Sequence, residues 1–421
     1  MLRLEVGLLL LGASVMSCGG SGPSVATGGA PGIGGGPSSG GQSGSGGQLG
    51  ATGGAPSGGT TGGGGSPGSG GAPSGGTVGT GGGSGGASSG GSVSTTAEPP
   101  SCAAGGPGLS TCGPDDESCC TSLLVTGGTF FRTYTNDGNG PSGTSAAATV
   151  SDFRLDKYEV TAARFRQFVT YLVDGGAPPA AGSGKHAHLN DGQGLQRGSA
   201  SGSYEPGWSD SWNSKLSGDI ADWTTVLAGG TAASKYGTWT ESAGDNDELP
   251  ITFPSWYEAY AFCIWDGGFL PSEAEWKYAA AGGDEQRRYP WGSETPGSDN
   301  QHLIFDCCFP SGQCSTSSGH DTCTGLVNVA PVGSTPLGVG RYGQFDLSGS
   351  VWEWNLDLYS AQLDSPCTDC AHFDGTDRVL PGGGFHSGMT YEYSYNRQSV
   401  NYNPDTYRGD YAVGLRCARE P

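Results

Sequence analysis

The sequence is poor in apolar residues and in positive charge. Only 34% of its 421 residues are hydrophobic, whereas 82 are glycine, so a large part of the chain cannot form a packed core. It has 19 Lys and Arg against 40 Asp and Glu, a formal net charge of −21. This charge keeps the protein soluble, attracts cations and repels phosphate backbones, so we expect no nucleic-acid partner. Beyond residue 17, no run is long and apolar enough to span a bilayer.

The first 100 residues predict export and a flexible connection. Residues 1–17 carry Arg3 and an apolar run at 6–11, and they resemble a bacterial lipoprotein signal peptide with Cys18 as the lipidated residue. A plain secretory signal is the alternative. Residues 18–100 are almost only Gly, Ser, Thr, Pro and Ala, which predicts a disordered tether with a reach of roughly 50 Å. We expect an outer-membrane or cell-surface lipoprotein that contacts the membrane only through its anchor. An anchor on the periplasmic face of the membrane is also compatible with the sequence.

The cysteine count agrees with export. Of 13 cysteines, 12 remain once Cys18 is set aside, and an even number in an exported chain predicts disulfides. Cys367 and Cys370 have a spacing that also suits zinc or redox chemistry, but structural bridges are the favoured interpretation.

The folded part is expected to begin near residue 101. A Cys-rich lead-in at 101–122 precedes one domain at 123–421, which contains a polar, Gly-rich insertion at about 175–248. Short strands are expected at 123–132 and 153–158.

Three helices are expected, each beginning after a residue whose side chain can cap free N–H groups. These residues are Thr161, Ser255 and Ser272. Later residues favour short extended pieces without helix signals.

An ordered set of short motifs identifies a family resemblance. The motifs are LLVTGGTFFR at 123–132, EVT at 159–161, GGFLPSEAEW at 267–276, YPWG at 289–292, SGSVWEW at 348–354, GGGF at 382–385 and GLRC at 414–417. In this order they resemble the formylglycine-generating enzyme (sulfatase-modifying factor) family. The resemblance implies an α+β, loop-rich variant of the C-type lectin fold with little regular secondary structure and several disulfides. One implied disulfide joins Cys263 to Cys417.

The resemblance also implies calcium as a structural cofactor. Calcium prefers several hard oxygen ligands, and the matching positions offer two carboxylates and two backbone carbonyls: Asp346, Gly349, Val351 and Glu353. The alternative is an acidic turn whose Glu353 accepts backbone hydrogen bonds. A second calcium site would use Asn300 and Asp321.

The copper site of the family is missing. Aerobic members hold copper(I) with two thiolates and use oxygen to convert a substrate cysteine to formylglycine. The matching positions here are Ser387 and Glu392, and copper(I) prefers sulfur. We therefore expect neither copper nor formylglycine synthesis by that mechanism. Tyr391 and Trp352 keep the residue types of the family's active site, although both are equally compatible with a packing role.

Histidines offer two other metal sites. His386 with Glu392 would suit iron or zinc, but a surface histidine in a binding groove is the favoured interpretation. His186 and His188 have a metal-like spacing, for which a solvated loop is favoured.

The stretch 391–411 is rich in Tyr, Asn and Ser, a composition typical of recognition surfaces. Ordinary packing explains it equally well. The leading hypothesis is therefore an exported, lipid-anchored sulfatase-modifying-factor-like protein whose groove binds a protein, peptide or glycan. An oxidoreductase of the same family with a different metal- or oxygen-dependent maturation reaction is the first alternative, and a passive surface structural protein is the second. Whether the protein is an enzyme stays open at this point.

Overall fold

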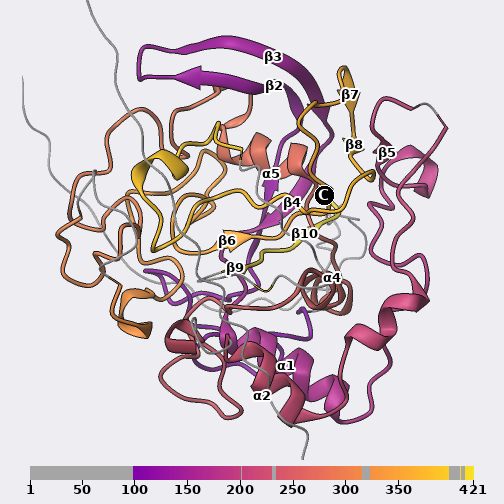
Figure 1. The fold of residues 1–421 in the computed structure, drawn as a ribbon, viewed down its shortest axis with the longest axis vertical. Helices are drawn as coiled ribbons and strands as arrows, with labels where there is room; N and C mark the ends of the chain where they lie inside the picture. The colour runs from indigo at the N-terminus through magenta and orange to yellow at the C-terminus, as the bar shows by residue number, and fades with distance from the viewer. Residues whose placement is uncertain (1–97, 201, 230–233, 315–322, 398–407, 409–412) are drawn as a thin grey trace, which may run out of the picture. The chain divides into compact units, whose positions relative to one another are not determined.

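The computed structural model describes residues 98–200, 202–229, 234–314, 323–397, 408 and 413–421 (Figure 1). The chain divides into two units, Met1–Ser89 and Gly90–Pro421, and all described residues belong to the second. The predicted signal peptide, Cys18 and nearly all of the tether lie outside the described residues. Within these ranges, no helix is long and apolar enough to cross a membrane.

The strands are short and form four small sheets. β1 (Ser122–Val125) and β10 (Ala418–Arg419) pair antiparallel with β4 (Phe153–Asp156). β2 (Gly128–Asn136) and β3 (Pro141–Val150) form an antiparallel hairpin to which β7 (Cys367–Thr368) adds in parallel. Two parallel pairs complete the set: β5 (Gln196–Arg197) with β8 (Cys370–Ala371), and β6 (Trp352–Glu353) with β9 (Val413–Gly414).

The helices lie mainly away from the hairpin. The α-helices are α1 (Ala162–Val173), α2 (Ile220–Leu227), α4 (Trp256–Trp265) and α5 (Glu273–Ala280). The 3-10 turns are η1 (Asn190–Gly192), η2 (Asp210–Lys215), η3 (Ser234–Tyr236), η4 (Gly283–Glu285), η6 (Leu326–Asn328) and η7 (Met389–Tyr391). In Figure 1 the long β2–β3 hairpin lies at one end, α1 and α2 lie at the other, and α5 lies beside the hairpin. The fold is the loop-rich α+β fold that the sequence predicts.

All three predicted helix starts are confirmed. Thr161 caps α1 by accepting a hydrogen bond from the backbone N–H of Arg164. Ser255 and Ser272 begin α4 and α5 with capping boxes, in which the serine and the residue three positions later satisfy each other's backbone N–H.

β3 is absent from the sequence prediction, and the strand predicted at 123–132 is two strands. β3 has no large apolar side chain before Val150, so it lacks the alternating pattern that indicates a strand. β3 is held in place by its antiparallel pairing with β2. Hydroxyl pairs add to this pairing at Thr129 with Thr149 (2.8 Å) and Thr133 with Ser145 (2.6 Å).

Aromatic side chains form the largest core. It lies around α1 and α4 and includes Trp256, Trp354 and Phe262, each at most 1% exposed. The predicted insertion contributes to this same core, since Trp208 and Trp223 are both 1% exposed. The insertion is therefore built into the domain.

The Cys-rich lead-in is also tied into the domain. Arg164 in α1 donates to the carbonyl of Cys119 (3.0 Å) and to the hydroxyl of Ser101 (3.0 Å). The same guanidinium forms a fully buried ion pair with Asp266 (2.7 Å). Because a buried charge is costly without its partners, these contacts fix the lead-in against α1.

Six disulfides use all 12 cysteines of the described unit. They join Cys102–Cys120, Cys112–Cys119, Cys263–Cys417, Cys307–Cys323, Cys308–Cys314 and Cys367–Cys370. Such density is typical of extracytoplasmic domains.

Candidate functional site

The two positions that match the copper thiolates contact one glycine turn at 382–384. Ser387 donates its backbone N–H to the carbonyl of Gly384 (2.7 Å). The carboxyl of Glu392 lies against Gly383, where an added Cβ would lie 2.3 Å from Glu392 Oε2. Gly383 also has a φ of 78°, which favours glycine. Only glycine therefore leaves room for the Glu392 side chain.

Glu392 is a buried acid. Its side chain is 1% exposed, and neither carboxyl oxygen has a hydrogen-bond partner of normal geometry among the described residues. Burial raises the pKa of Glu392 well above its ordinary value, and the nearby N–H groups of Gly384 and Gly349 offset this only in part. The shift favours the protonated carboxyl, which is a poor metal ligand.

Aromatic and imidazole side chains border the same turn. A Cβ on Gly384 would lie 3.0 Å from Trp352 Cδ1 and 3.4 Å from His386 Cε1. The rings of Trp352 and Tyr391 are 5.9 Å apart, edge to face. His386 is only 8% exposed, so its interpretation as a surface histidine is wrong. Among the described residues, no third metal-binding side chain joins His386 and Glu392.

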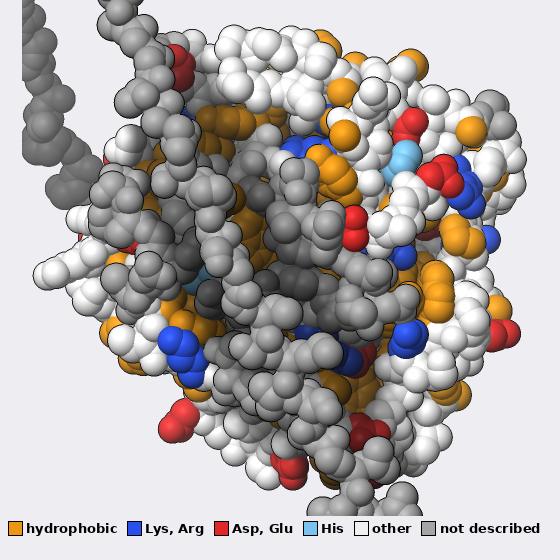
Figure 2. All heavy atoms as spheres, in the orientation of Figure 1, with side chains coloured by type: hydrophobic (Ala, Val, Ile, Leu, Met, Phe, Trp, Pro, Cys, Tyr) orange, Lys and Arg blue, Asp and Glu red, His pale blue; other side chains and the backbone are white. Residues whose placement is uncertain are grey.

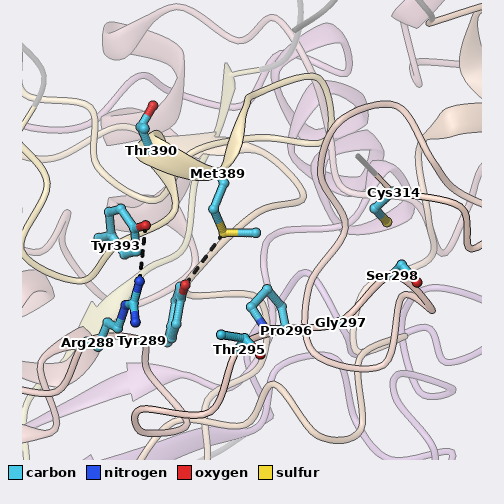
Figure 3. Close-up of a pocket in the computed structure, with 10 residues that line it drawn as sticks. All are labelled: Arg288, Tyr289, Thr295, Pro296, Gly297, Ser298, Cys314, Met389, Thr390 and Tyr393. Atoms are coloured by element: carbon cyan, nitrogen blue, oxygen red, sulfur yellow. Dashed lines mark hydrogen bonds between the residues drawn. The ribbon is translucent and has the colours of Figure 1, made fainter. Parts of the chain in front are cut away.

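A cleft of about 800 Å³ lies beside η7 (Figure 3). Met389 and Thr390 of η7 form one side, two and three residues after Ser387. The full lining is Arg288, Tyr289, Thr295, Pro296, Gly297, Ser298, Cys314, Met389, Thr390 and Tyr393. Sequence reasoning missed Arg288, although it directly precedes the YPWG motif.

The tyrosines at the end of η7 and after it alternate with buried residues. Tyr391, Tyr393 and Tyr395 are partly exposed, whereas Glu392 and Ser394 between them are buried. Tyr393 lines the cleft and stacks on Tyr395 with ring centroids 5.0 Å apart. This places the first part of the Tyr-rich stretch at the cleft. Most of its later residues, 398–407 and 409–411, lie outside the described residues.

The predicted calcium ligands lie in a buried acidic cluster. Glu159, Asp346 and Glu353 are all at most 4% exposed and share one buried cation, Arg416. Burial raises the pKa of Asp346, and it raises the pKa of Glu159 well above its ordinary value. Among the described residues, these three side chains do not gather their oxygen atoms closely enough to form a metal-binding group by themselves.

The oxygen atoms of this cluster already have partners. Asp346 accepts from the N–H of Gly333 (2.6 Å) and the hydroxyl of Thr335 (3.0 Å). Glu353 accepts from Arg416 (2.7 Å) and from the indole of Trp276 (2.8 Å). Glu353 would therefore have to release one contact to become a calcium ligand.

The second predicted calcium site has one described member. The side-chain oxygen of Asn300 lies 3.0 Å from the sulfur of Cys308 and 3.3 Å from that of Cys314. Asp321 lies outside the described residues, so this site stays a prediction.

The loop of His186 is not solvated, which corrects the sequence interpretation. His186 is fully buried, with Nδ1 3.0 Å from Glu205 and Nε2 3.0 Å from Glu275. Burial alone would lower the pKa of His186, but the charges of Glu275 and Glu205 raise it to about 10. We call these three residues the His186 clamp. It fastens the insertion to α5.

The His186 clamp predicts a pH-dependent stability. His186→Gln is expected to lower the free energy of unfolding by about 3 kcal/mol, because it leaves buried carboxylates without their cation. Since the folded pKa of about 10 exceeds the ordinary 6.5, this contribution is complete below pH 6.5 and is lost as the pH rises through 10. Urea unfolding at pH 6, 8 and 10 measures it.

The matched control is His372→Gln. His372 pairs with Asp364 at 3.0 Å, but both side chains are partly exposed, so a small loss is expected. A loss for His186→Gln that stayed constant from pH 6 to pH 10 would contradict the clamp.

These features define a disulfide-rich, loop-rich domain with a glycine turn, a buried acidic cluster and an adjoining cleft. The sulfatase-modifying factor enzyme 1-like domain family matches residues 110–421, and the chain belongs to this family. It is 30% identical over 318 residues to the formylglycine-generating enzyme of Thermomonospora curvata, covering 71% of this chain and 93% of that enzyme.

Other relatives show the breadth of the family. The chain is 35% identical over 129 residues to the inactive C-alpha-formylglycine-generating enzyme 2 of Bos taurus, covering 29% of this chain and 40% of that protein. Among solved structures, PvdO from Pseudomonas aeruginosa is 19% identical with a TM-score of 0.42, covering 75% of this chain and all of PvdO. Active and inactive formylglycine-generating enzymes are thus both among its relatives.

Proposed function

We propose that this protein is an exported, lipid-anchored member of the family that binds a ligand in the cleft and does not oxidise thiols with copper. The observation that carries this proposal is Glu392, a buried carboxyl packed against Gly383 at the second thiolate position. Copper(I) requires soft ligands, and the described residues at the turn offer a hydroxyl and a carboxyl in their place.

The adjoining cleft supports a binding function. It contains tyrosine and threonine hydroxyls, one arginine and the flexible Met389, a mixture of adaptable polar and apolar contacts that suits recognition. The inactive relative supports the same conclusion, because its name indicates a family scaffold without that activity.

An oxidoreductase with a different metal is the second candidate. It is favoured by His386, whose imidazole lies beside Gly384 at the vacated site. This candidate requires a third ligand, which the described residues do not supply.

We further propose calcium as a structural cofactor at Asp346. The carboxyl groups gathered around Arg416 support it, and the carbonyls of Gly349 and Val351 are the further ligands proposed. A bound divalent cation would neutralise the cluster and stabilise the turn that carries Trp352.

Metal analysis of the purified full chain tests both proposals. Mass spectrometry of the metals is expected to find calcium, which Asp346→Asn reduces, and only traces of copper and iron. His386→Ala is expected to leave the metal content unchanged. Stoichiometric copper or iron that His386→Ala removes would overturn the binding function and favour the oxidoreductase.

A further inference from the structure

We propose that the cleft recognises a small ligand with a carboxylate group, and that Arg288 is the residue that binds this group. The proposal rests on the proposed binding function and deepens it by naming the ligand chemistry.

The side chain of Arg288 is held in place and retains a donor. Its guanidinium lies over the rings of Tyr289 and Tyr393, at 5.3 and 5.2 Å from the centroids. Nη1 donates to the carbonyl of Asp137 (3.0 Å), and Nη2 donates to the hydroxyl of Tyr393 (3.4 Å). Each of these two nitrogens carries a second N–H that these bonds do not use, whereas Nε is shielded from solvent. An arginine fixed in this way loses little conformational entropy when it binds a carboxylate.

A second donor lies next to Arg288. The hydroxyl of Tyr289 donates to the sulfur of Met389 at 3.6 Å (Figure 3), and a thioether is a weak acceptor. A carboxylate oxygen is a stronger acceptor, so it would replace the sulfur. Burial raises the pKa of Tyr289, which keeps the hydroxyl protonated as a donor.

The charge of the cleft selects for an anion. Arg288 is its one charged lining residue, and none of the lining residues is acidic. This is unusual for a chain with a net charge of −21. On the described part of the face in Figure 2, acidic and basic side chains are scattered rather than gathered by sign. Asp137 interacts electrostatically with Arg288 but does not line the cleft, so the lining itself carries only a positive charge.

The size of the cleft sets the scale of the ligand. Its volume of about 800 Å³ lies within the range of roughly 300 to 1,000 Å³ typical of small-molecule sites. Met389 and Pro296 supply apolar surface next to the donors. We therefore infer a compact ligand with an apolar body and one carboxylate.

Calorimetric titration of the full chain with phenylacetate tests this inference. Phenylacetamide is the neutral probe of the same shape, and acetate is the carboxylate without the body. Phenylacetate is expected to bind more tightly than either. Arg288→Gln is expected to weaken its binding about 10- to 100-fold, the usual effect of one charged hydrogen bond, and Arg288→Lys to weaken it less.

Arg287→Gln is the matched control. It removes the same charge one residue earlier, but Arg287 pairs with Glu285 (2.6 Å) and does not line the cleft. The affinity of this variant for phenylacetate is expected to stay within about twofold of wild type, because the Arg287 guanidinium donates to Glu285 and to the carbonyl of Pro290 and is not part of the cleft lining.

Three results would overturn the inference: no binding of phenylacetate, equal binding of phenylacetamide, or unchanged binding in Arg288→Gln. Tight binding of phenylacetamide alone would overturn the carboxylate preference but leave the binding function standing. Copper-dependent turnover of a thiol would instead overturn the binding function, whatever Arg288 recognises.

Discussion

Cysteines at both vacated positions, Ser387→Cys with Glu392→Cys, are expected to raise the affinity for copper(I) by about 100- to 10,000-fold. Loss of even one outer-shell partner commonly costs a metal site about 10- to 100-fold in affinity, and two direct ligands contribute at least that much each. Both positions contact the turn at 382–384, so two thiolates there supply the soft pair that copper(I) prefers. Competition with a chromophoric copper(I) chelator measures the affinity.

Single variants are the controls for this experiment. Ser387→Cys alone and Glu392→Cys alone supply one thiolate each, so neither is expected to reproduce the affinity of the pair. If wild type bound copper(I) as tightly as the double variant, the residues at these two positions would not decide copper(I) binding.

Removal of one disulfide, Cys263→Ser with Cys417→Ser, is expected to lower the free energy of unfolding by about 5 kcal/mol in the loop-entropy treatment. This bridge joins residues 154 positions apart, and both cysteines are fully buried. It connects α4 to the strands at the C-terminus, so its loss frees about half of the described domain from one long-range constraint. Urea unfolding of both proteins measures the difference.

A short disulfide gives the matched control. Cys308→Ser with Cys314→Ser opens a bridge between residues only six positions apart, for which the same treatment gives about 2 kcal/mol. Equal losses in the two double variants would show that loop closure does not govern the stabilisation.

Local signals in the sequence predict the helices but not the hairpin. A capping side chain contacts backbone N–H groups within three residues, so the residues that decide a helix start stand together in the sequence. β3 depends instead on its pairing with β2, which a short turn at 137–140 separates from it, and with β7, where Ala148 pairs with the distant Cys367. Its small residues carry no apolar pattern of their own.

The sequence identified residues of the site, but it did not predict which of them are buried or which side chains surround them. The motif order identifies Ser387, Glu392 and Trp352, and the structure places them at one turn. The sequence did not predict the burial of His386 and His186, because burial depends on neighbours such as Glu205 and Glu275 that are distant in the chain. Arg288 was missed for the same reason, since the cleft is formed by three separate segments.

The former active site is expected to carry out no copper-dependent oxidation of thiols. The most direct test is to incubate the copper-supplemented full chain with oxygen and a cysteine-containing peptide, and to follow the mass of the peptide. We predict that the cysteine is converted no faster than in a reaction without protein. Conversion of the cysteine to an aldehyde with multiple turnovers would contradict the assignment of Glu392 as a substitute that ends copper chemistry.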